Sequence, residues 1–242
     1  MDAFLSFHAP GFWLVMALLT WIIVVGVRPF VSQSAQTLSI PIYWVMLPYL
    51  ALISGGVSPR LMGLLYIDWV VSLRIGVGLT MALIALALGM RAVATLAPAD
   101  ATKSDGQHSK HPLWRTALIV AGLCGAEEFF WAFLRGASME LLTVSQFSVD
   151  VPAYWAVWIA VILAAPSALL NTSGAYSRLV KATILFMSSI VFFYTRNFWL
   201  CWTLHAVVWM LFHQPTQHQP ILDRLAPSPE NHASATGKNQ SR

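Results

Sequence analysis

Charged residues are scarce in this sequence of 242 residues. Asp, Glu, Lys and Arg together make up 10% of the chain, whereas hydrophobic residues make up 57%. An ordinary soluble domain contains about 25% charged residues. A chain of this length and composition cannot enclose all of its apolar side chains in one water-soluble core. The composition therefore predicts that lipid covers much of the protein surface.

Several sequence features that would indicate other classes of protein are also missing. There are two cysteines, Cys124 and Cys201, and both lie in apolar runs, which favours buried thiols over a disulfide framework. The sequence has no glycine-rich phosphate loop, no nucleophile elbow and no nucleic-acid-binding motif. The net charge is +4, but the basic residues are scattered between apolar runs. This distribution is typical of membrane topology signals and predicts contact with the lipid bilayer and no binding of nucleic acid.

Long apolar runs are the dominant feature that is present. A membrane-spanning helix needs about 20 apolar residues, and the sequence offers seven candidate spans: Gly11–Val27, Ile40–Val57, Ile75–Met90, Thr116–Leu134, Ala153–Leu170, Ala182–Tyr194 and Phe198–Phe212. No basic stretch precedes the first run and no small-residue cleavage site follows it, so we expect a retained helix and not a signal peptide. The segment Ser58–Arg74 carries charges among apolar residues, which favours an interfacial amphipathic helix. The predicted fold is all-α, a polytopic transmembrane helical bundle of about seven spans.

Basic residues predict the orientation of this bundle. If the N-terminus lies outside, ten of them fall in inside segments: Arg28, Arg91, Lys103, Lys110, Arg115, Arg178, Lys181, Arg224, Lys238 and Arg242. Three then lie outside, namely Arg60, Arg74 and Arg196, and Arg135 lies at a membrane edge. This bias follows the positive-inside rule and predicts an outside N-terminus. We expect a multi-pass protein of the bacterial inner membrane.

Two polar segments divide the chain. Residues 98–112 are rich in turn formers and predict a cytoplasmic loop, and residues 214–242 predict a disordered tail. The loop separates N-terminal helices in residues 1–97, which carry no interpretable motif, from a core in residues 113–213.

Ionisable residues inside two of the predicted spans are the candidates for chemistry. Glu127 and Glu128 lie near the middle of the fourth span, and His205 lies near the middle of the seventh. Charged groups in a spanning helix cost about 2.5–3.5 kcal/mol each on insertion scales and usually mark function. A carboxylate in such a site can act as a general base toward water, and an imidazole at the same depth can bind that water or stabilise an oxyanion. Two structural alternatives stay open, because Arg135 can pair with Glu128 two turns away or extend to the outer headgroups.

Residues 113–212 resemble the CAAX-protease and bacteriocin-processing family of intramembrane endopeptidases. The resemblance lies in Gly-Ala-Glu-Glu-Phe-Phe-Trp at residues 125–131, and in Tyr-Thr-Arg-Asn-Phe-Trp-Leu-Cys-Trp-Thr-Leu-His-Ala at residues 194–206. That family carries Glu-Glu-x-x-x-Arg, then Phe-x-x-x-His, then His-x-x-x-Asn. The resemblance implies Glu127 or Glu128 as the water activator and His205 as a partner for water, oxyanion or metal.

The sequence departs from the family pattern in each of the three motifs. Ala132 occupies the arginine position of the first motif and Arg135 follows three residues later, so Arg135 is the expected substitute. The best match to the second motif places Asn171 where the family has histidine, and Trp209 replaces the asparagine of the third. Family members are described both as metalloproteases and as glutamate-dependent proteases. A catalytic zinc usually has three protein ligands, and one histidine supports it poorly, so we expect no metal and no cofactor.

The resulting hypothesis is an intramembrane endopeptidase that hydrolyses a peptide bond in a membrane-associated protein or peptide. Its expected site residues are Glu127, Glu128, His205, Arg135 and Asn171. The alternative is a catalytically inactive homologue that serves as a membrane scaffold or as an assembly factor for partner proteins.

Overall fold

The computed structural model describes residues 6–96, 113–144, 150–172 and 174–212. Within these ranges the chain is helical, without strands, which confirms the predicted all-α class. The described residues form one short 3-10 helix, Arg28–Phe30, and seven α-helices: α1 Pro10–Val27, α2 Gln33–Ile53, α3 Trp69–Leu96, α4 Leu113–Val144, α5 Pro152–Leu170, α6 Ala175–Thr195 and α7 Phe198–Phe212. The loop and the tail predicted at 98–112 and 214–242 lie outside the described residues.

Five of these helices are long and apolar enough to cross a membrane: α1, α3, α4, α5 and α6. The apolar parts of the other two, Leu38–Ile53 and Phe198–Phe212, are shorter. Each predicted span corresponds to one helix, but the bounds differ. Helix α4 continues past Leu134 to Val144, and α6 begins at Ala175, seven residues before the predicted start. This earlier start places Lys181 inside a helix.

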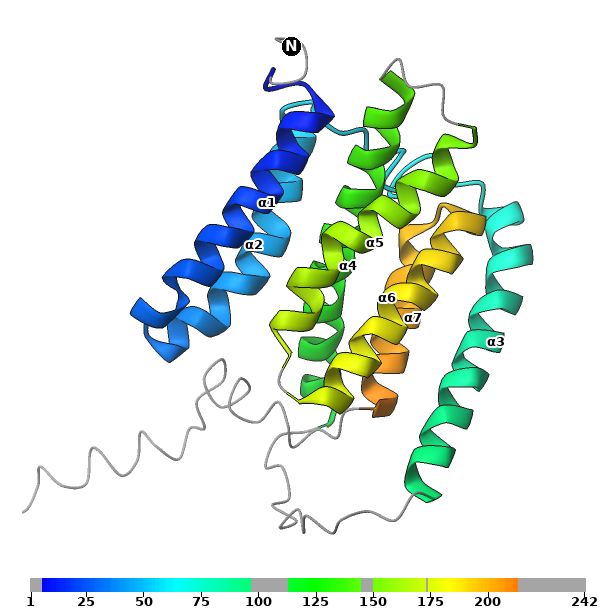
Figure 1. Cartoon of the computed structure of the whole chain (residues 1–242). Coiled ribbons are helices and arrows are strands. Elements are labelled where there is room, and N and C mark those ends of the chain that lie inside the picture. The colour runs from blue at the N-terminus through cyan, green and yellow to red at the C-terminus, as the bar shows by residue number, and fades with distance from the viewer. Residues whose placement is uncertain (1–5, 97–112, 145–149, 173, 213–242) are drawn as a thin grey trace, which may run out of the picture.

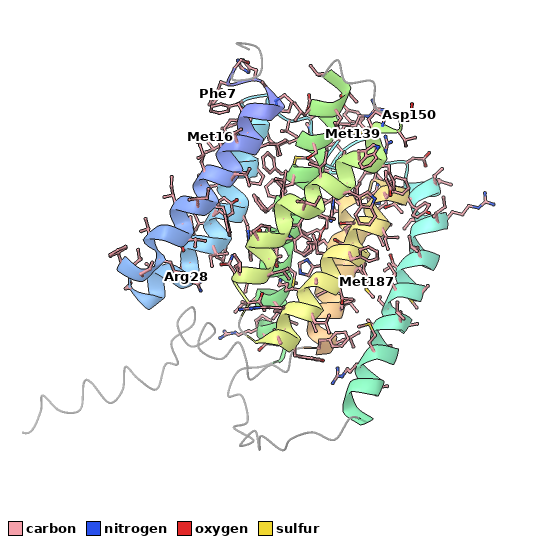
Figure 2. The ribbon with its side chains drawn as sticks, in the orientation of Figure 1. Phe7, Met16, Arg28, Met139, Asp150 and Met187 are labelled. Carbon is pink, nitrogen blue, oxygen red and sulfur yellow. The ribbon has the colours of Figure 1, made fainter. Side chains whose placement is uncertain are left out.

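Successive helices run in opposite directions, and α4 lies at the centre of the bundle (Figure 1). Helix α4 packs against α1, α2, α5 and α7, whereas α3 packs against α6 and α7. The α1–α2 pair and α3 therefore lie on different sides of the core, and side chains fill the spaces between the helices (Figure 2). In the most apolar part of α1 and of α3, 22% of the residues are buried, compared with 50% in α4 and 56% in α6. Helices α4 and α6 thus form the interior, where polar groups can be shielded from lipid.

The prediction of an amphipathic helix at 58–74 is wrong for residues 58–68, whereas residues 69–74 form the start of α3. Residues 54–68 form turns, and helical structure begins at Trp69. The Asp68 carboxylate accepts the backbone N–H of Val71 at 3.0 Å, which starts α3 in the manner of an N-cap. Gly63 has a φ of +71°, and a Cβ there would lie 2.5 Å from the backbone oxygen of Arg196. The segment is therefore a closely packed connection, because its turn residues and its contact with the α6–α7 turn exclude a helix.

A two-residue turn joins α6 to α7 and sets the position of α7. Arg196 ends α6 in a left-handed conformation with a φ of +47°. The side-chain oxygen of Asn197 accepts the backbone N–H groups of Trp199 at 2.9 Å and Leu200 at 3.4 Å. Because Asn197 is fully buried, this cap fixes the start of the helix that carries His205.

Candidate functional site

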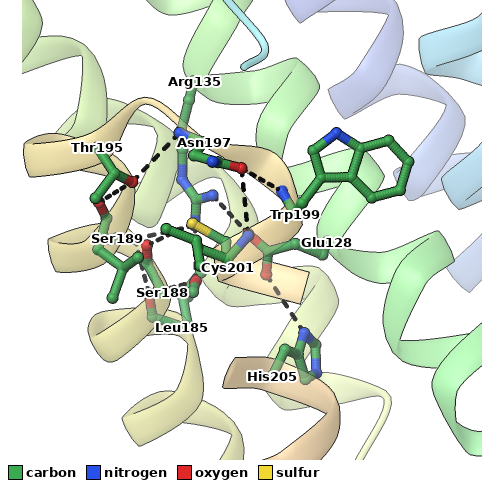
Figure 3. A network of polar contacts seen from close by, with 12 residues as sticks. Glu128, Arg135, Leu185, Ser188, Ser189, Thr195, Asn197, Trp199, Cys201 and His205 are labelled. Carbon is green, nitrogen blue, oxygen red and sulfur yellow. Dashed lines mark hydrogen bonds and ion pairs between the residues drawn. The ribbon is translucent and has the colours of Figure 1, made fainter. Parts of the chain in front are cut away.

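Five ionisable side chains meet in the interior of the bundle, and we call them the ionic cluster. Helix α4 supplies three of them, α6 one and α7 one, and each is at most 7% exposed: Glu127, Glu128, Arg135, Lys181 and His205. The prediction that the glutamates and His205 converge is confirmed. Figure 3 shows Glu128 between Arg135 and His205.

Arg135 holds Glu128 within the same helix. Its Nη1 donates to Oε1 of Glu128 at 2.6 Å, and its Nη2 donates to the hydroxyls of Ser188 at 2.8 Å and Ser189 at 3.3 Å (Figure 3). Arg135 is 2% exposed, so the alternative in which it extends to the outer headgroups is wrong. Two helical turns separate the pair, and a long guanidinium that leans back along the helix spans that distance. Arg135 thus reaches Glu128 although Ala132 occupies the expected position.

The His205 imidazole lies between the two carboxylates. Its Nδ1 is 3.4 Å from Oε2 of Glu128, and its Nε2 is 3.6 Å from Oε2 of Glu127. The ring of Trp131 stacks on it with the centroids 4.8 Å apart and the planes at 10°. A carboxylate can only accept, so the contact with Glu128 assigns a hydrogen to Nδ1. In the neutral form of the ring, Nε2 then carries a lone pair.

Lys181 is the site residue that the sequence reasoning missed. The positive-inside count places it in a segment on the inner side of the membrane, but it lies within α6 and is 7% exposed. Its ammonium donates to Oε2 of Glu127 and lies 4.1 Å from the centre of the Trp209 ring. Trp209 is the residue that stands where the resembled family has asparagine. A signal was present in the sequence, because Lys181 falls on a helical stripe with Ser177, Ile184 and Ser188, all of which are buried.

Asn171 does not join the ionic cluster. It caps the C-terminal end of α5, and its side-chain nitrogen donates to the backbone oxygen of Ser167 at 2.7 Å. Helix α5 ends near one end of the bundle, whereas Glu128 and His205 lie midway along their helices (Figure 1). The prediction that Asn171 takes the place of the second-motif histidine is therefore wrong, because Asn171 lies at the end of α5 and away from the ionic cluster.

Opposite charges balance within the ionic cluster. Two carboxylates face one guanidinium and one ammonium, and the imidazole lies between them. Removing one partner of such a buried pair lowers the free energy of unfolding by about 3–5 kcal/mol, because the remaining charge is then buried without an opposite charge. Among the described residues no group of three potential metal ligands occurs. Arg135 and Lys181 already form ion pairs with the two carboxylates. The side chains of the ionic cluster therefore do not fit a catalytic zinc, which usually takes three protein ligands.

Two atoms of the ionic cluster are buried without a hydrogen-bond partner in the described part of the chain. They are Oε1 of Glu127 and Nε2 of His205, and both belong to side chains that are otherwise anchored. The indole nitrogen of Trp131, whose ring stacks on His205, is also buried without a hydrogen-bond partner among the described residues. Buried polar atoms are nearly always hydrogen-bonded, so neighbouring exceptions indicate a place that a water molecule or a substrate atom can occupy.

A cavity of about 20 Å³ near one end of the bundle borders Arg135, the one member of the ionic cluster that lines it. Arg135 and Met139 of α4, Ala156 of α5 and Phe192 of α6 line it, together with Arg196 in the α6–α7 turn. A cavity of roughly 10–15 Å³ is enough for one water molecule. Water can therefore approach the guanidinium that holds Glu128 from the end where α5 begins and α6 ends.

The resemblance to the CAAX-protease family rests on the two glutamates, His205 and the α6–α7 turn. Comparison with protein-family models, with curated proteins and with solved structures gave no match. Family membership therefore stays a prediction from these residues.

Proposed function

We propose that this chain is an intramembrane endopeptidase of the CAAX-protease type, which hydrolyses a peptide bond in a membrane-associated protein or peptide. The observation that carries the proposal is the pair of unpartnered buried atoms, Oε1 of Glu127 and Nε2 of His205, on side chains that approach within 3.6 Å of each other. A water molecule between these atoms donates one hydrogen to each. Its oxygen lone pairs then point away from both bases and toward a substrate carbonyl.

The two glutamates have different roles in this proposal. Glu127 is the general base, because one of its carboxylate oxygens has no partner. Both oxygens of Glu128 are engaged, one by Arg135 and the other by His205. Glu128 therefore orients the imidazole, and Arg135 in turn fixes Glu128.

The proposed setting is a lipid bilayer. All seven helices span it with the N-terminus outside, and the membrane is the inner membrane of a bacterium. In this orientation the cavity beside Arg135 faces the outer side, and it supplies the water that hydrolysis consumes. The apolar side chains exposed on α1 and α3, such as Ile23 at 61% and Val70 at 79%, support contact with lipid.

A comparison of protein termini in the native cell tests the proposal. The membrane fraction of cells with the wild-type chain is compared by mass spectrometry with that of cells carrying Glu127→Gln, His205→Gln or the matched control Glu140→Gln. Glu140 lies on the same helix but outside the ionic cluster, where its carboxylate accepts the backbone N–H of Ser58. We expect a set of cleaved protein termini that occurs in the wild type and in the control. The same termini should be missing from the Glu127→Gln and His205→Gln strains.

The same comparison distinguishes the scaffold alternative. If the termini are identical in all strains although each variant inserts normally, the chain is not a peptidase. A partner that falls in amount but keeps its size when the whole chain is deleted would instead assign an assembly or stability role.

A further inference from the structure

The proposed hydrolysis also needs a hydrogen-bond donor for the oxyanion that forms when water attacks a carbonyl. Such donors are worth about 10²–10³ in kcat each. In the proposed reaction Nε2 of His205 accepts a hydrogen from the water, and three hydrogen bonds hold Arg135 to Glu128, Ser188 and Ser189. The other cation of the ionic cluster, Lys181, pairs with the general base Glu127 itself.

We propose that Lys181 is a catalytic residue whose ammonium stabilises the oxyanion; this inference rests on the proposed peptidase function. An ammonium has three N–H donors, and the described residues supply one hydrogen-bond acceptor to it, Oε2 of Glu127. The face of Trp209 lies on another side of it at 4.1 Å. The ammonium therefore lies beside the general base and has a donor left for the substrate.

The movement of charge during the reaction favours this assignment. The water oxygen forms a bond to the carbonyl carbon, the carbonyl π electrons move onto its oxygen, and the water proton passes to Glu127. Negative charge thus leaves the carboxylate that pairs with Lys181 and appears on the neighbouring oxyanion. When the C–N bond breaks, the carbonyl re-forms and the leaving amine takes the proton from Glu127. The ammonium faces one negative charge throughout, so no net charge is created in the apolar interior.

Trp131 is the competing donor, because its indole nitrogen is buried without a partner while its ring stacks on His205. Trp131→Phe keeps an aromatic ring for stacking and removes the N–H. The two candidates can therefore be separated by conservative substitutions.

The test uses the full chain in lipid vesicles and a fluorogenic peptide spanning the bond identified from the termini. The variants are Lys181→Met, Lys181→Arg, Trp131→Phe and the matched control Arg178→Met, which removes an exposed cation from the same helix. We expect Lys181→Met to lower kcat by about 10²–10³-fold with little change in KM, since the donor acts on the transition state. Lys181→Arg should recover part of the loss, Arg178→Met should match the wild type, and Trp131→Phe should lower kcat far less than Lys181→Met does.

A second measurement excludes a purely structural role for Lys181. The probe is a phosphonamidate peptide of the same sequence, which is tetrahedral and anionic at the reacting centre. We expect Lys181→Met to lower the affinity for this inhibitor by about the same factor as it lowers kcat. In the inactive Glu127→Gln variant, adding Lys181→Met should leave the affinity for the uncleaved peptide unchanged. Equal weakening of both ligands overturns the inference.

The outcomes separate the inference from the proposed function. If no terminus depends on Glu127, both are overturned. If Glu127→Gln abolishes cleavage but Lys181→Met keeps the wild-type kcat, or if Trp131→Phe carries the loss instead, the peptidase function stands and the role of Lys181 is overturned.

Discussion

The contact between Glu128 and Arg135 predicts a large and strongly non-additive effect on stability. Arg135→Met leaves the Glu128 carboxylate fully buried without its cation, and it also removes the donors to Ser188 and Ser189. Removing one partner of a buried pair typically costs about 3–5 kcal/mol, compared with about 0–1 kcal/mol for an exposed pair. We therefore expect the free energy of unfolding to fall by about 3–5 kcal/mol.

Reversible unfolding in mixed micelles, with increasing SDS and helicity as the signal, measures this change. The control is Arg74→Met, which removes an exposed arginine from α3 and should alter the free energy by no more than about 0.5 kcal/mol. In Glu128→Gln/Arg135→Met neither charge remains, and the glutamine oxygen can still accept from His205. This double variant should therefore be more stable than Arg135→Met alone.

The double-mutant cycle also measures the coupling energy between Glu128 and Arg135. For residues in direct contact the coupling energy is typically about 0.5–3 kcal/mol, and for a buried charge pair we expect a value near the upper end. If the effects of Glu128→Gln and Arg135→Met simply add, or if Arg135→Met is no more harmful than Arg74→Met, the two side chains do not form a buried ion pair.

Three further predictions concern the site and its surroundings. Asn171→Ala should leave kcat/KM for the fluorogenic peptide within about twofold of the wild type, because the Asn171 side chain donates to a backbone oxygen of its own helix. A loss of tenfold or more would show that Asn171 contributes to the reaction. Ala156→Leu should fill the cavity beside Arg135 and lower kcat at least several-fold, whereas Ile162→Phe on the exposed side of the same helix should not; equal rates would exclude the cavity as the water path. Gly63→Ala should lower the free energy of unfolding by more than about 1–2 kcal/mol, because it combines a positive φ with a Cβ 2.5 Å from a backbone oxygen. Gly78→Ala in α3, where a Cβ meets nothing within 4 Å, is its control, and equal unfolding energies for the two variants would contradict the packing of the α2–α3 connection.

Local sequence patterns predicted those features that depend on one helix at a time. The seven apolar runs each became a helix, because burial in lipid or in the bundle interior needs a continuous apolar stretch with its backbone hydrogen bonds satisfied. Glu128 and Arg135 could be proposed as a pair, because two helical turns bring residues seven apart onto one face. The charge pattern of segment 58–74 resembles that of an amphipathic helix, but only residues 69–74 are helical. Over residues 58–68 the positive φ of Gly63 and its packing against Arg196 outweigh that pattern.

The sequence by itself determined that the chain has apolar helices, that two acids and one histidine lie inside them, and that these residues share a depth. Tertiary structure alone decided which side chains complete the ionic cluster. Asn171 matched a motif but lies at the end of α5, whereas Lys181 matched no motif and meets Glu127 because α6 packs in the core with its polar stripe turned inward. The physical reason is that helical periodicity fixes neighbours within one helix. Contacts between helices depend on their relative rotation and depth, and on how far a lysine or arginine side chain reaches.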